Sequence, residues 1–252
     1  MHRPPPVRND TLRVNLILFE PDELARPLPR TDPRARHVLE VLRRQIGDTF
    51  DAGQVNGPRG KATVTAVDSA ALHLAFAWGP PPAPSDPLTL LVGLPRPQTA
   101  RDILRDATTL GVSALHFVRT EKTEASYAQS TLWASGEWRR HLLTGAEQAF
   151  DTRIPAVTSG RTLAEALAAL PVDSARLALD NYESPAPLSG YAGRAATPHV
   201  LALGGERGWS SRDRDALRQA GFQFLHLGPR ILRTETAVVA GVSLLRARQG
   251  LM

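Results

Sequence analysis

The stretch that decides the fold is Leu227-Gly-Pro-Arg-Ile-Leu-Arg-Thr-Glu-Thr-Ala237, near the carboxyl end of the chain. It follows a short apolar run, residues 222–227, that is typical of a buried strand, and it precedes a periodic apolar segment, residues 237–245, that predicts a helix. Gly228 and Pro229 predict a tight turn between the two, because glycine adopts backbone angles closed to other residues and proline fixes its own φ. A strand, a turn and a helix in this order place ligand-binding groups at the carboxyl edge of an open α/β sheet.

The same turn carries two arginines, Arg230 and Arg233, and one acid, Glu235. One interpretation is an ordinary helix start, with Thr234 or Thr236 near the amino terminus and Glu235 in the first turn. The other interpretation is a functional site, since charged groups at the edge of a sheet are well placed to contact a ligand. The turn by itself leaves both open.

The chain around this turn predicts a parallel sheet covered by helices on both faces, because apolar strands alternate with helical segments after residue 88. The expected strands are residues 88–94, 114–118, 154–157, 175–179, 199–203 and 222–227. The expected helices are residues 99–110, ending at Gly111, then 132–150, 163–170, 211–220 and 237–245.

Two further strand ends carry candidate ligand-binding loops. Gly204-Gly-Glu-Arg-Gly208 follows one strand and precedes a helix capped by Ser210 or Ser211, whose amino-terminal end favours an anionic group. Asp180-Asn-Tyr-Glu183 follows another strand. Three such loops in one parallel domain predict a single pocket. The glycine-rich loop is neither a dinucleotide fingerprint nor a P-loop, which disfavours a nucleotide-binding oxidoreductase.

The first third of the chain predicts a small, mostly β domain that carries one helix, starting at Asp32-Pro33. Its expected strands are residues 13–19, 47–51, 60–67 and 72–76, with a hairpin tip at 56–60. Residues 79–87 hold five prolines in nine positions and are typical of a semi-rigid linker. The expected domains are therefore residues 1–79 and 88–252, joined by residues 80–87.

Composition narrows the function classes. The net charge is +5 and all basic residues except Lys61 and Lys122 are arginine, which permits nucleic-acid binding but is equally typical of a GC-rich genome. The absence of cysteine excludes disulfides and thiolate metal sites, and the scattered histidines indicate no metal. No apolar run reaches the length of a membrane span and no leader is visible, so we expect a cytoplasmic protein.

Together these motifs resemble the RsmE-type rRNA methyltransferases. The resemblance rests on residues 227–237, the glycine-rich loop, Ala146-Glu-Gln148 with Arg153 and Pro155, His37-Val-Leu-Glu-Val-Leu-Arg43 and Leu110-Gly-Val112, and it runs from about residue 13 to residue 250. This family belongs to the knotted SPOUT class of S-adenosylmethionine enzymes and methylates N3 of a uridine in 16S rRNA of the small ribosomal subunit.

The resemblance implies an α/β fold: a SPOUT-type parallel sheet with a C-terminal trefoil knot, preceded by a small PUA-like β-barrel that binds RNA. It also implies a homodimer that uses neither a metal nor a membrane. It places S-adenosylmethionine against eight residues: Leu203, Gly204, Glu206, Gly208, Leu227, Gly228, Ile231 and Leu232.

The resemblance also suggests roles in catalysis and RNA binding. We hypothesise that Arg233 stabilises charge that develops on the base, and that Glu235 orients the base or holds Arg233, with Arg230 as a further catalytic candidate. The expected rRNA contacts are Arg13, Arg36, His37 and Arg43.

Two departures from the family pattern keep alternatives open. Arg207 stands where the family has a glycine, and Thr99 stands where it has a lysine. One alternative is a knotted methyltransferase that acts on another RNA. The other is a non-catalytic RNA-binding protein that has kept the fold.

Overall fold

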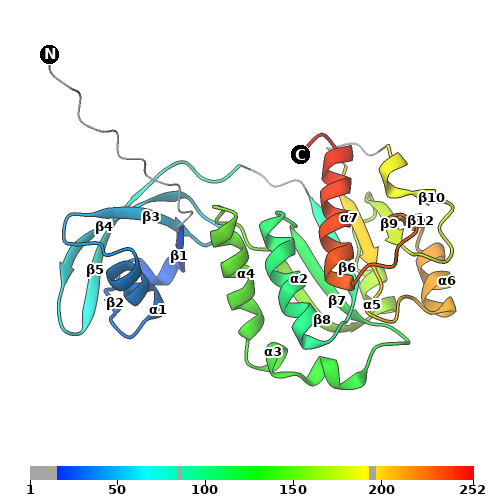
Figure 1. Ribbon diagram of the computed structural model, residues 1–252, viewed down its shortest axis with the longest axis horizontal. Coiled ribbons are helices and arrows are strands. Elements are labelled where there is room, and N and C mark those ends of the chain that lie inside the picture. Colours follow the sequence, from blue (N-terminus) through cyan, green and yellow to red (C-terminus); the bar gives the residue numbers. More distant parts are fainter. Residues whose placement is uncertain (1–15, 84–86, 193–196) are drawn as a thin grey trace, which may run out of the picture. The chain divides into compact units, whose positions relative to one another are not determined.

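The computed structural model describes residues 16–83, 87–192 and 197–252, which form two compact units (Figure 1). Unit 1 comprises Met1–Pro81 with Phe150–Thr152, and unit 2 comprises Pro82–Ala149 with Arg153–Met252. The predicted rRNA contact Arg13 lies outside the described residues.

Unit 1 is built on a curled five-stranded sheet in the order β1-β3-β4-β5-β2. Its strands are β1 (Ile17–Phe19), β2 (Leu28–Pro29), β3 (Thr49–Gln54), β4 (Arg59–Val67) and β5 (Ala71–Trp78). β1 pairs with β3 in parallel and the other pairs are antiparallel. The predicted hairpin tip at residues 56–60 is confirmed, since β3 and β4 pair directly across it.

The predicted helix of unit 1 begins where its cap places it. The side chain of Asp32 accepts a 2.8 Å hydrogen bond from the Arg34 backbone amide, and α1 (Pro33–Arg36) follows and runs on as a π-helical turn, η2 (His37–Val41). Arg34 also pairs with Glu23 at 2.8 Å, and this hydrogen bond lowers the pKa of Glu23. Arg34 therefore stabilises the unit instead of facing solvent with its neighbours.

Three residues far along the chain complete unit 1. The backbone carbonyls of Phe150 and Thr152 accept hydrogen bonds at 2.8 Å from the Arg59 guanidinium and the Asn56 amide. The hydroxyl of Thr152 donates to the carbonyl of Gly57 at 2.6 Å. Nothing local in the sequence marks this pairing, so the sequence alone does not predict that these residues belong to the β unit.

Unit 2 contains a seven-stranded sheet whose strands are all parallel, in the order β10-β12-β9-β11-β6-β7-β8. Its strands are β6 (Leu88–Gly93), β7 (Ala114–Arg119), β8 (Ala156–Thr162), β9 (Ala175–Leu179), β10 (Ala186–Pro187), β11 (His199–Leu203) and β12 (Gln223–His226). The predicted parallel sheet is confirmed. Sequence periodicity missed two short edge strands, β10 in this sheet and β2 in unit 1.

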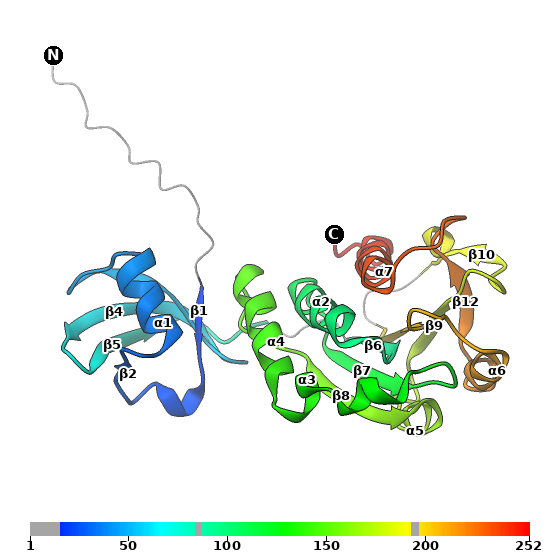
Figure 2. The same ribbon diagram turned by 60° about the horizontal axis from the view of Figure 1, so that its bottom comes forward.

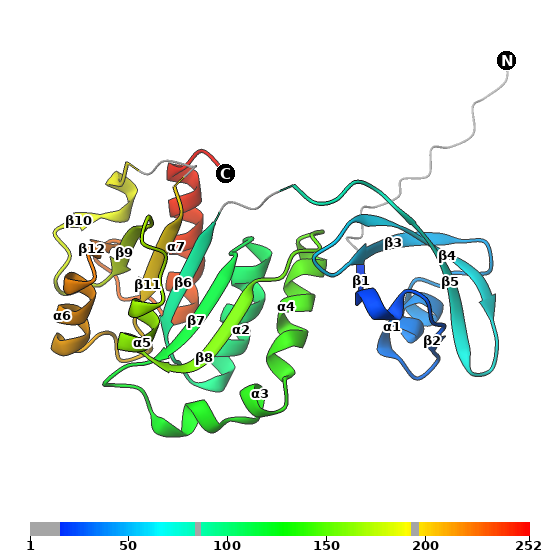
Figure 3. The same cartoon turned by 180° about the vertical axis from the view of Figure 1, so that it is seen from behind.

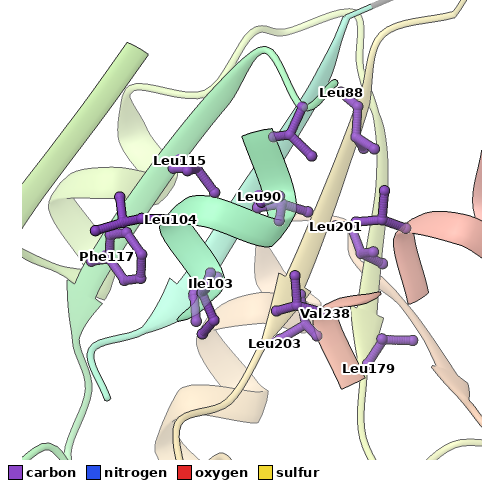
Figure 4. Packing of buried hydrophobic residues seen from close by; sticks show 14 of the residues in the cluster. Leu88, Leu90, Ile103, Leu104, Leu115, Phe117, Leu179, Leu201, Leu203 and Val238 are labelled. Atoms are coloured by element: carbon purple, nitrogen blue, oxygen red, sulfur yellow. The ribbon is translucent and has the colours of Figure 1, made fainter. Parts of the chain in front are cut away.

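Helices cover both faces of this sheet (Figures 2 and 3). Those on one face are α2 (Pro97–Thr109), α3 (Thr131–Ala134), α4 (Glu137–Gln148) and α7 (Thr234–Arg248), and those on the other are α5 (Leu163–Ala168) and α6 (Ser211–Gln219). The short 3-10 turns are η1 (Pro21–Glu23), η3 (Ala125–Gln129) and η4 (Leu188–Gly190). Figure 4 shows Ile103 of α2 and Val238 of α7 in the same hydrophobic cluster as Leu201 and Leu203 of the central strand β11. In the described ranges, no helix has the length and apolar character needed to cross a bilayer.

The prediction of a single helix over residues 132–150 is wrong. The chain forms α3 and α4 instead, and Gly136 between them takes a φ of +75°, which a continuing helix forbids. Within α4, a Cβ added at Gly145 would lie 2.3 Å from the carbonyl oxygen of Arg105 in α2. The two helices therefore pack backbone against backbone at this glycine.

Candidate active site

A cavity of about 640 Å³ opens at the carboxyl edge of the seven-stranded sheet. Its lining comes from the segments that follow four neighbouring strands: Arg96 and Thr99 after β6, residues 179–182 after β9, residues 203–209 after β11, and residues 227, 231–235 and 237 after β12. The three loops that the sequence analysis assigned to one pocket do line one cavity. Its size lies within the range of small-molecule sites, about 300–1,000 Å³.

The glycine-rich loop is shaped by close backbone packing. A Cβ on Gly204 would lie 2.8 to 3.0 Å from backbone atoms of Gly208 and Trp209. A Cβ on Gly93, at the end of β6, would lie 2.6 Å from the amide nitrogen of Gly205. The loop closes on itself through a hydrogen bond from the Gly208 amide to the Gly205 carbonyl at 2.9 Å. Glycine is required here because backbone meets backbone.

Arg207 fits this loop without backbone strain. Among the described non-glycine residues, positive φ angles occur only at Arg43, Asn56 and Phe150. The side chain of Arg207 is exposed and lines the cavity. The departure from the family pattern therefore adds a cation at the cavity without deforming the loop.

A second cation stands where the first helix of unit 2 begins. Arg96 precedes α2 and lines the cavity, and its amide donates to Glu206 Oε1 at 3.0 Å. Its guanidinium Nε donates to the hydroxyl of Thr99 at 3.2 Å, and Thr99 itself is buried in the first turn of α2. Arg96 thus supplies a cation at this corner of the cavity, where Thr99 stands in place of the family's lysine. Glu206 connects the glycine-rich loop to the start of α2.

The loop after β9 is organised by a buried carboxylate. Asp180 accepts hydrogen bonds from the amides of Tyr182 and Glu183, both at 2.7 Å, and from Arg214 Nε at 2.9 Å. Asp180 and Arg214 are each less than 10% exposed. A buried charge is stable only when it is paired and hydrogen-bonded, so Asp180 supports the loop and is not free to act on a ligand.

The two helix ends at this edge differ in electrostatics. Ser210 caps α6 by accepting from the amide of Asp213 at 3.1 Å, and the Asp213 carboxylate accepts from the Ser210 amide at 2.9 Å. The anionic ligand expected at this end is therefore replaced by the protein's own carboxylate. α7 begins after Arg233 with no side-chain cap, so its first amides keep their positive end available.

The residues expected to carry chemistry divide into two groups. Arg233 and Glu235 line the cavity, Arg233 as the N-cap residue of α7 and Glu235 in its first turn. The helix start is therefore part of the cavity wall, so the two interpretations of this stretch do not exclude each other. No ion pair between Arg233 and Glu235 is present in the described part of the chain. Arg230 lies outside the lining and is exposed after the turn.

The predicted cofactor contacts lie along the same wall, with one exception. The lining includes Leu203, Gly204, Glu206, Gly208, Leu227, Ile231 and Leu232. Gly228 is not part of it: its φ is +107° and its amide donates to His226 Nδ1 at 3.0 Å, which makes it the residue that turns the chain.

The cavity lining includes two large, mostly exposed side chains, and the Arg214 guanidinium lies over the ring of one of them, Tyr182, 5.4 Å from its centroid. The aliphatic side chain of Ile231 and the aromatic side chain of Tyr182 are each 76% exposed. Exposed large apolar groups that line one cavity indicate that a ligand with an apolar face packs there. The hydrogen-bond donors and acceptors that the protein offers to such a ligand would be mainly backbone groups of the surrounding loops. No cluster of metal-ligating side chains occurs in residues 16–83, 87–192 and 197–252.

The predicted RNA contacts of unit 1 lie on and just after its helix. Arg36 and Arg43 are exposed and His37 is half-buried. Arg36 donates to the carbonyl of Thr31 at 3.3 Å, and Arg43 takes a φ of +53° where the helical segment ends. Arg44 beside it is exposed as well, so this corner of unit 1 is basic.

Sequence reasoning missed three residues that contact the loops of the site: Arg96, Trp209 and Lys122. Arg96 follows an apolar strand, a position that could have drawn notice. The indole of Trp209 is buried and donates to the carbonyl of Leu179 at 3.1 Å, which binds the end of β9 to the loop after β11. The role of Trp209 depends on contacts between segments 30 residues apart.

The arrangement of parallel sheet, glycine-rich loop and strand-end cavity matches a known class. Residues 81–246 match the family described as RNA methyltransferase domain, which places the chain among the RNA methyltransferases. A protein of Treponema pallidum named ribosomal RNA small subunit methyltransferase E is 34% identical over 243 residues, which cover 93% of this chain and 91% of that protein. The chain belongs to this family, that of the ribosomal RNA small subunit methyltransferases E.

Solved structures share the fold at low sequence identity. The Neisseria gonorrhoeae ribosomal RNA small subunit methyltransferase E, described as bound to S-adenosyl methionine, has a TM-score of 0.72 at 23% identity and covers 92% of this chain and 97% of its own. A probable rRNA-methyltransferase from Porphyromonas gingivalis has a TM-score of 0.79 at 20% identity and covers 92% of this chain and 98% of its own.

Proposed function

We propose that this protein transfers a methyl group from S-adenosylmethionine to N3 of a uridine in 16S rRNA of the small ribosomal subunit. The observation that carries the proposal is the cavity at the carboxyl edge of the parallel sheet, with the glycine-rich loop on one side and the uncapped start of α7 on the other. Family membership supports the same reaction class.

The residues present fit the cofactor. Loops that need glycine because backbone meets backbone also bring backbone donors and acceptors close to a ligand, and Ile231 and Leu232 offer apolar surface for an adenine ring. The cofactor would be held by Leu203, Gly204, Glu206, Gly208, Leu227, Ile231 and Leu232. When bound, it supplies an electrophilic methyl group on a sulfonium, a chemistry that needs no metal.

The protein's task is to present a nucleophilic nitrogen. Uracil N3 carries a weakly acidic proton that must leave before or during methyl transfer, and the negative charge then spreads onto the neighbouring carbonyl oxygens. Arg233 and the first amides of α7 stabilise that charge. The Glu235 carboxylate accepts the N3 proton or orients the base, and the proton passes on to water. Positioning of the two reactants contributes much of the remaining rate.

We assign residues 1–79, the main part of unit 1, to RNA binding as a PUA-like β-barrel domain, and residues 88–252 to methyl transfer, except that residues 150–152 belong to unit 1. Support comes from the curled sheet and from the exposed basic residues of its helical corner. We also propose a C-terminal trefoil knot and a homodimer. The knot rests on the resemblance alone. The dimer is supported by α7, which is rich in apolar residues and leaves Val239 37% exposed. A molar mass of two chains by light scattering is the expected result for the dimer.

Reversing the charge of Arg36 and Arg43 together should weaken RNA binding by about tenfold or more at low salt. Each lost phosphate contact removes a released counterion, so the slope of log Kd against log salt should flatten by about one to two. Binding of a small-subunit rRNA fragment at several salt concentrations checks this. Reversal of Arg26, an exposed arginine of the same unit paired with Asp22, is the control. Unchanged affinity and slope in the double variant would contradict the assignment.

The proposed function is tested by two measurements on the purified full chain. Calorimetric titration with S-adenosylmethionine should show saturable binding to one site per chain. Incubation with tritiated cofactor and 16S rRNA or small subunits should label one uridine, and mapping of the product should place the methyl group on N3. Absence of cofactor binding, even with RNA present, would favour the non-catalytic alternative. Label on another RNA would favour the alternative substrate.

A further inference from the structure

Lys122 lies beside the glycine-rich loop but outside the cavity. It follows β7, and the segment after β7 contributes no residue to the cavity lining. Its ammonium group donates to the carbonyl of Arg207 at 3.2 Å and to the carbonyl of Trp209 at 2.9 Å. Both acceptors belong to the stretch that forms the cavity wall after β11. Lys122 therefore contacts this loop from outside the cavity that the loop lines.

The contact continues from Trp209 to a third strand. The indole nitrogen of Trp209 donates to the carbonyl of Leu179, the last residue of β9, at 3.1 Å. Lys122 thus links the segment after β7 to the loop after β11, and Trp209 links that loop to the end of β9. Leu179 and Trp209 both line the cavity, so the position of its wall depends on this chain of contacts.

The charge of Lys122 is directed to these two carbonyls. Its neighbour Glu121 pairs with Arg212 at 3.4 Å, and the carbonyls of Arg207 and Trp209 are the partners that Lys122 has in the described residues. Hydrogen bonds from a charged donor are stronger than neutral ones, and a lysine supplies three donors from one atom. A single side chain therefore holds two carbonyl groups of the loop, two residues apart.

The loop needs such a contact because of its composition. Gly204, Gly205 and Gly208 make it flexible, and ordering glycine costs more backbone entropy than ordering any other residue. Its own turn supplies one hydrogen bond, from Gly208 to Gly205. A loop already held in its binding shape binds a ligand more tightly, because less ordering remains to be done on binding.

We propose that Lys122 is a positioning residue that holds the glycine-rich loop in its binding shape from outside the cavity. Its contribution falls on cofactor affinity and not on the transfer step, since it touches neither the cavity nor the α7 start. The inference rests on the proposed function, in which this loop binds S-adenosylmethionine.

The test compares Lys122→Met, which keeps the length of the side chain and removes its donors, with Lys122→Arg, which keeps donors and charge. Calorimetry with S-adenosylmethionine should show about tenfold weaker binding for Lys122→Met and a change below about threefold for Lys122→Arg. At saturating cofactor, kcat of Lys122→Met on rRNA should stay within about threefold of the wild type. Lys61→Met, at the chain's other lysine, is the matched control and should bind like the wild type.

Each outcome separates the inference from the function on which it rests. Wild-type affinity in Lys122→Met would overturn the role of Lys122 and leave the proposed function intact. Equal losses in kcat and affinity, with a lowered melting temperature, would show a general structural role and also overturn it. Failure of the wild type to bind the cofactor would overturn both. If Lys122→Met does not fold, Lys122→Gln, which retains a neutral donor, takes its place in the same comparison.

Discussion

Arg233→Ala is expected to lower kcat by about 10²- to 10³-fold while leaving the affinity for S-adenosylmethionine within about threefold of the wild type. Loss of one donor that stabilises developing negative charge has this size in other enzymes. Arg233 lines the cavity at the uncapped start of α7, where its charge and the helix amides act on the same region. The expected loss lies in the transfer step, because the base acquires its charge only as N3 gives up its proton.

Single-turnover rates at saturating cofactor and rRNA measure this effect directly, and calorimetry measures the cofactor affinity. Arg212→Ala removes an exposed arginine of α6 that lies outside the cavity lining, and it serves as the matched control. Arg230→Ala should cost much less than Arg233→Ala, because Arg230 lies outside the cavity lining although both belong to the same turn. Normal turnover by Arg233→Ala would eliminate Arg233 as the group that stabilises charge.

Gly204→Ala is expected to weaken cofactor binding by about 100-fold or more. The added Cβ would lie 2.8 Å from Gly208 Cα, 2.9 Å from Gly208 C and 3.0 Å from the amide nitrogen of Trp209. These are backbone atoms, so the loop must move to relieve the contact. A displacement of about 1 Å can cost about two orders of magnitude in rate, and we expect a loss of similar size in cofactor affinity.

The matched control for this substitution is Gly190→Ala in η4, where a Cβ would meet nothing within 4 Å. Both substitutions replace a glycine of unit 2 by alanine, so a difference in cofactor affinity between the two variants reports on the space around Gly204. Calorimetry and a thermal melt of each variant separate loss of binding from loss of folding. Wild-type affinity in Gly204→Ala would mean that the loop yields without cost, and the cavity wall described above would then be wrong.

Local signals in the sequence located most of the elements that build the site. Asp32 marked the start of α1 because a cap acts within two residues, and apolar runs located the strands because burial selects them one by one. The same kind of signal failed at α3 and α4, where the apolar pattern continues across the Gly136 turn. Apolar periodicity records which side faces the core and does not record where the backbone turns.

The candidate site divides in the same way. The three loops were identifiable from the sequence, because turn residues such as glycine and proline follow apolar strands, and parallel strands end at one edge of the sheet. The difference between the two helix ends was not, because both begin with serine, threonine or acidic residues nearby. Only the structure shows that Asp213 occupies the end of α6 and that α7 is left uncapped.

By itself, the sequence of this protein determined the parallel sheet, the strand ends that carry the loops, the place of Arg233 and Glu235 at a helix start, and the resemblance to its family. Each rests on signals that are local in the sequence, such as an apolar run, a turn or a short motif. The tertiary structure alone decided that residues 150–152 join unit 1, that Arg96 meets Glu206, and that Lys122 holds the glycine-rich loop. These contacts join residues 85 or more positions apart, and a single sequence records no distance between such residues until the sheet brings them together.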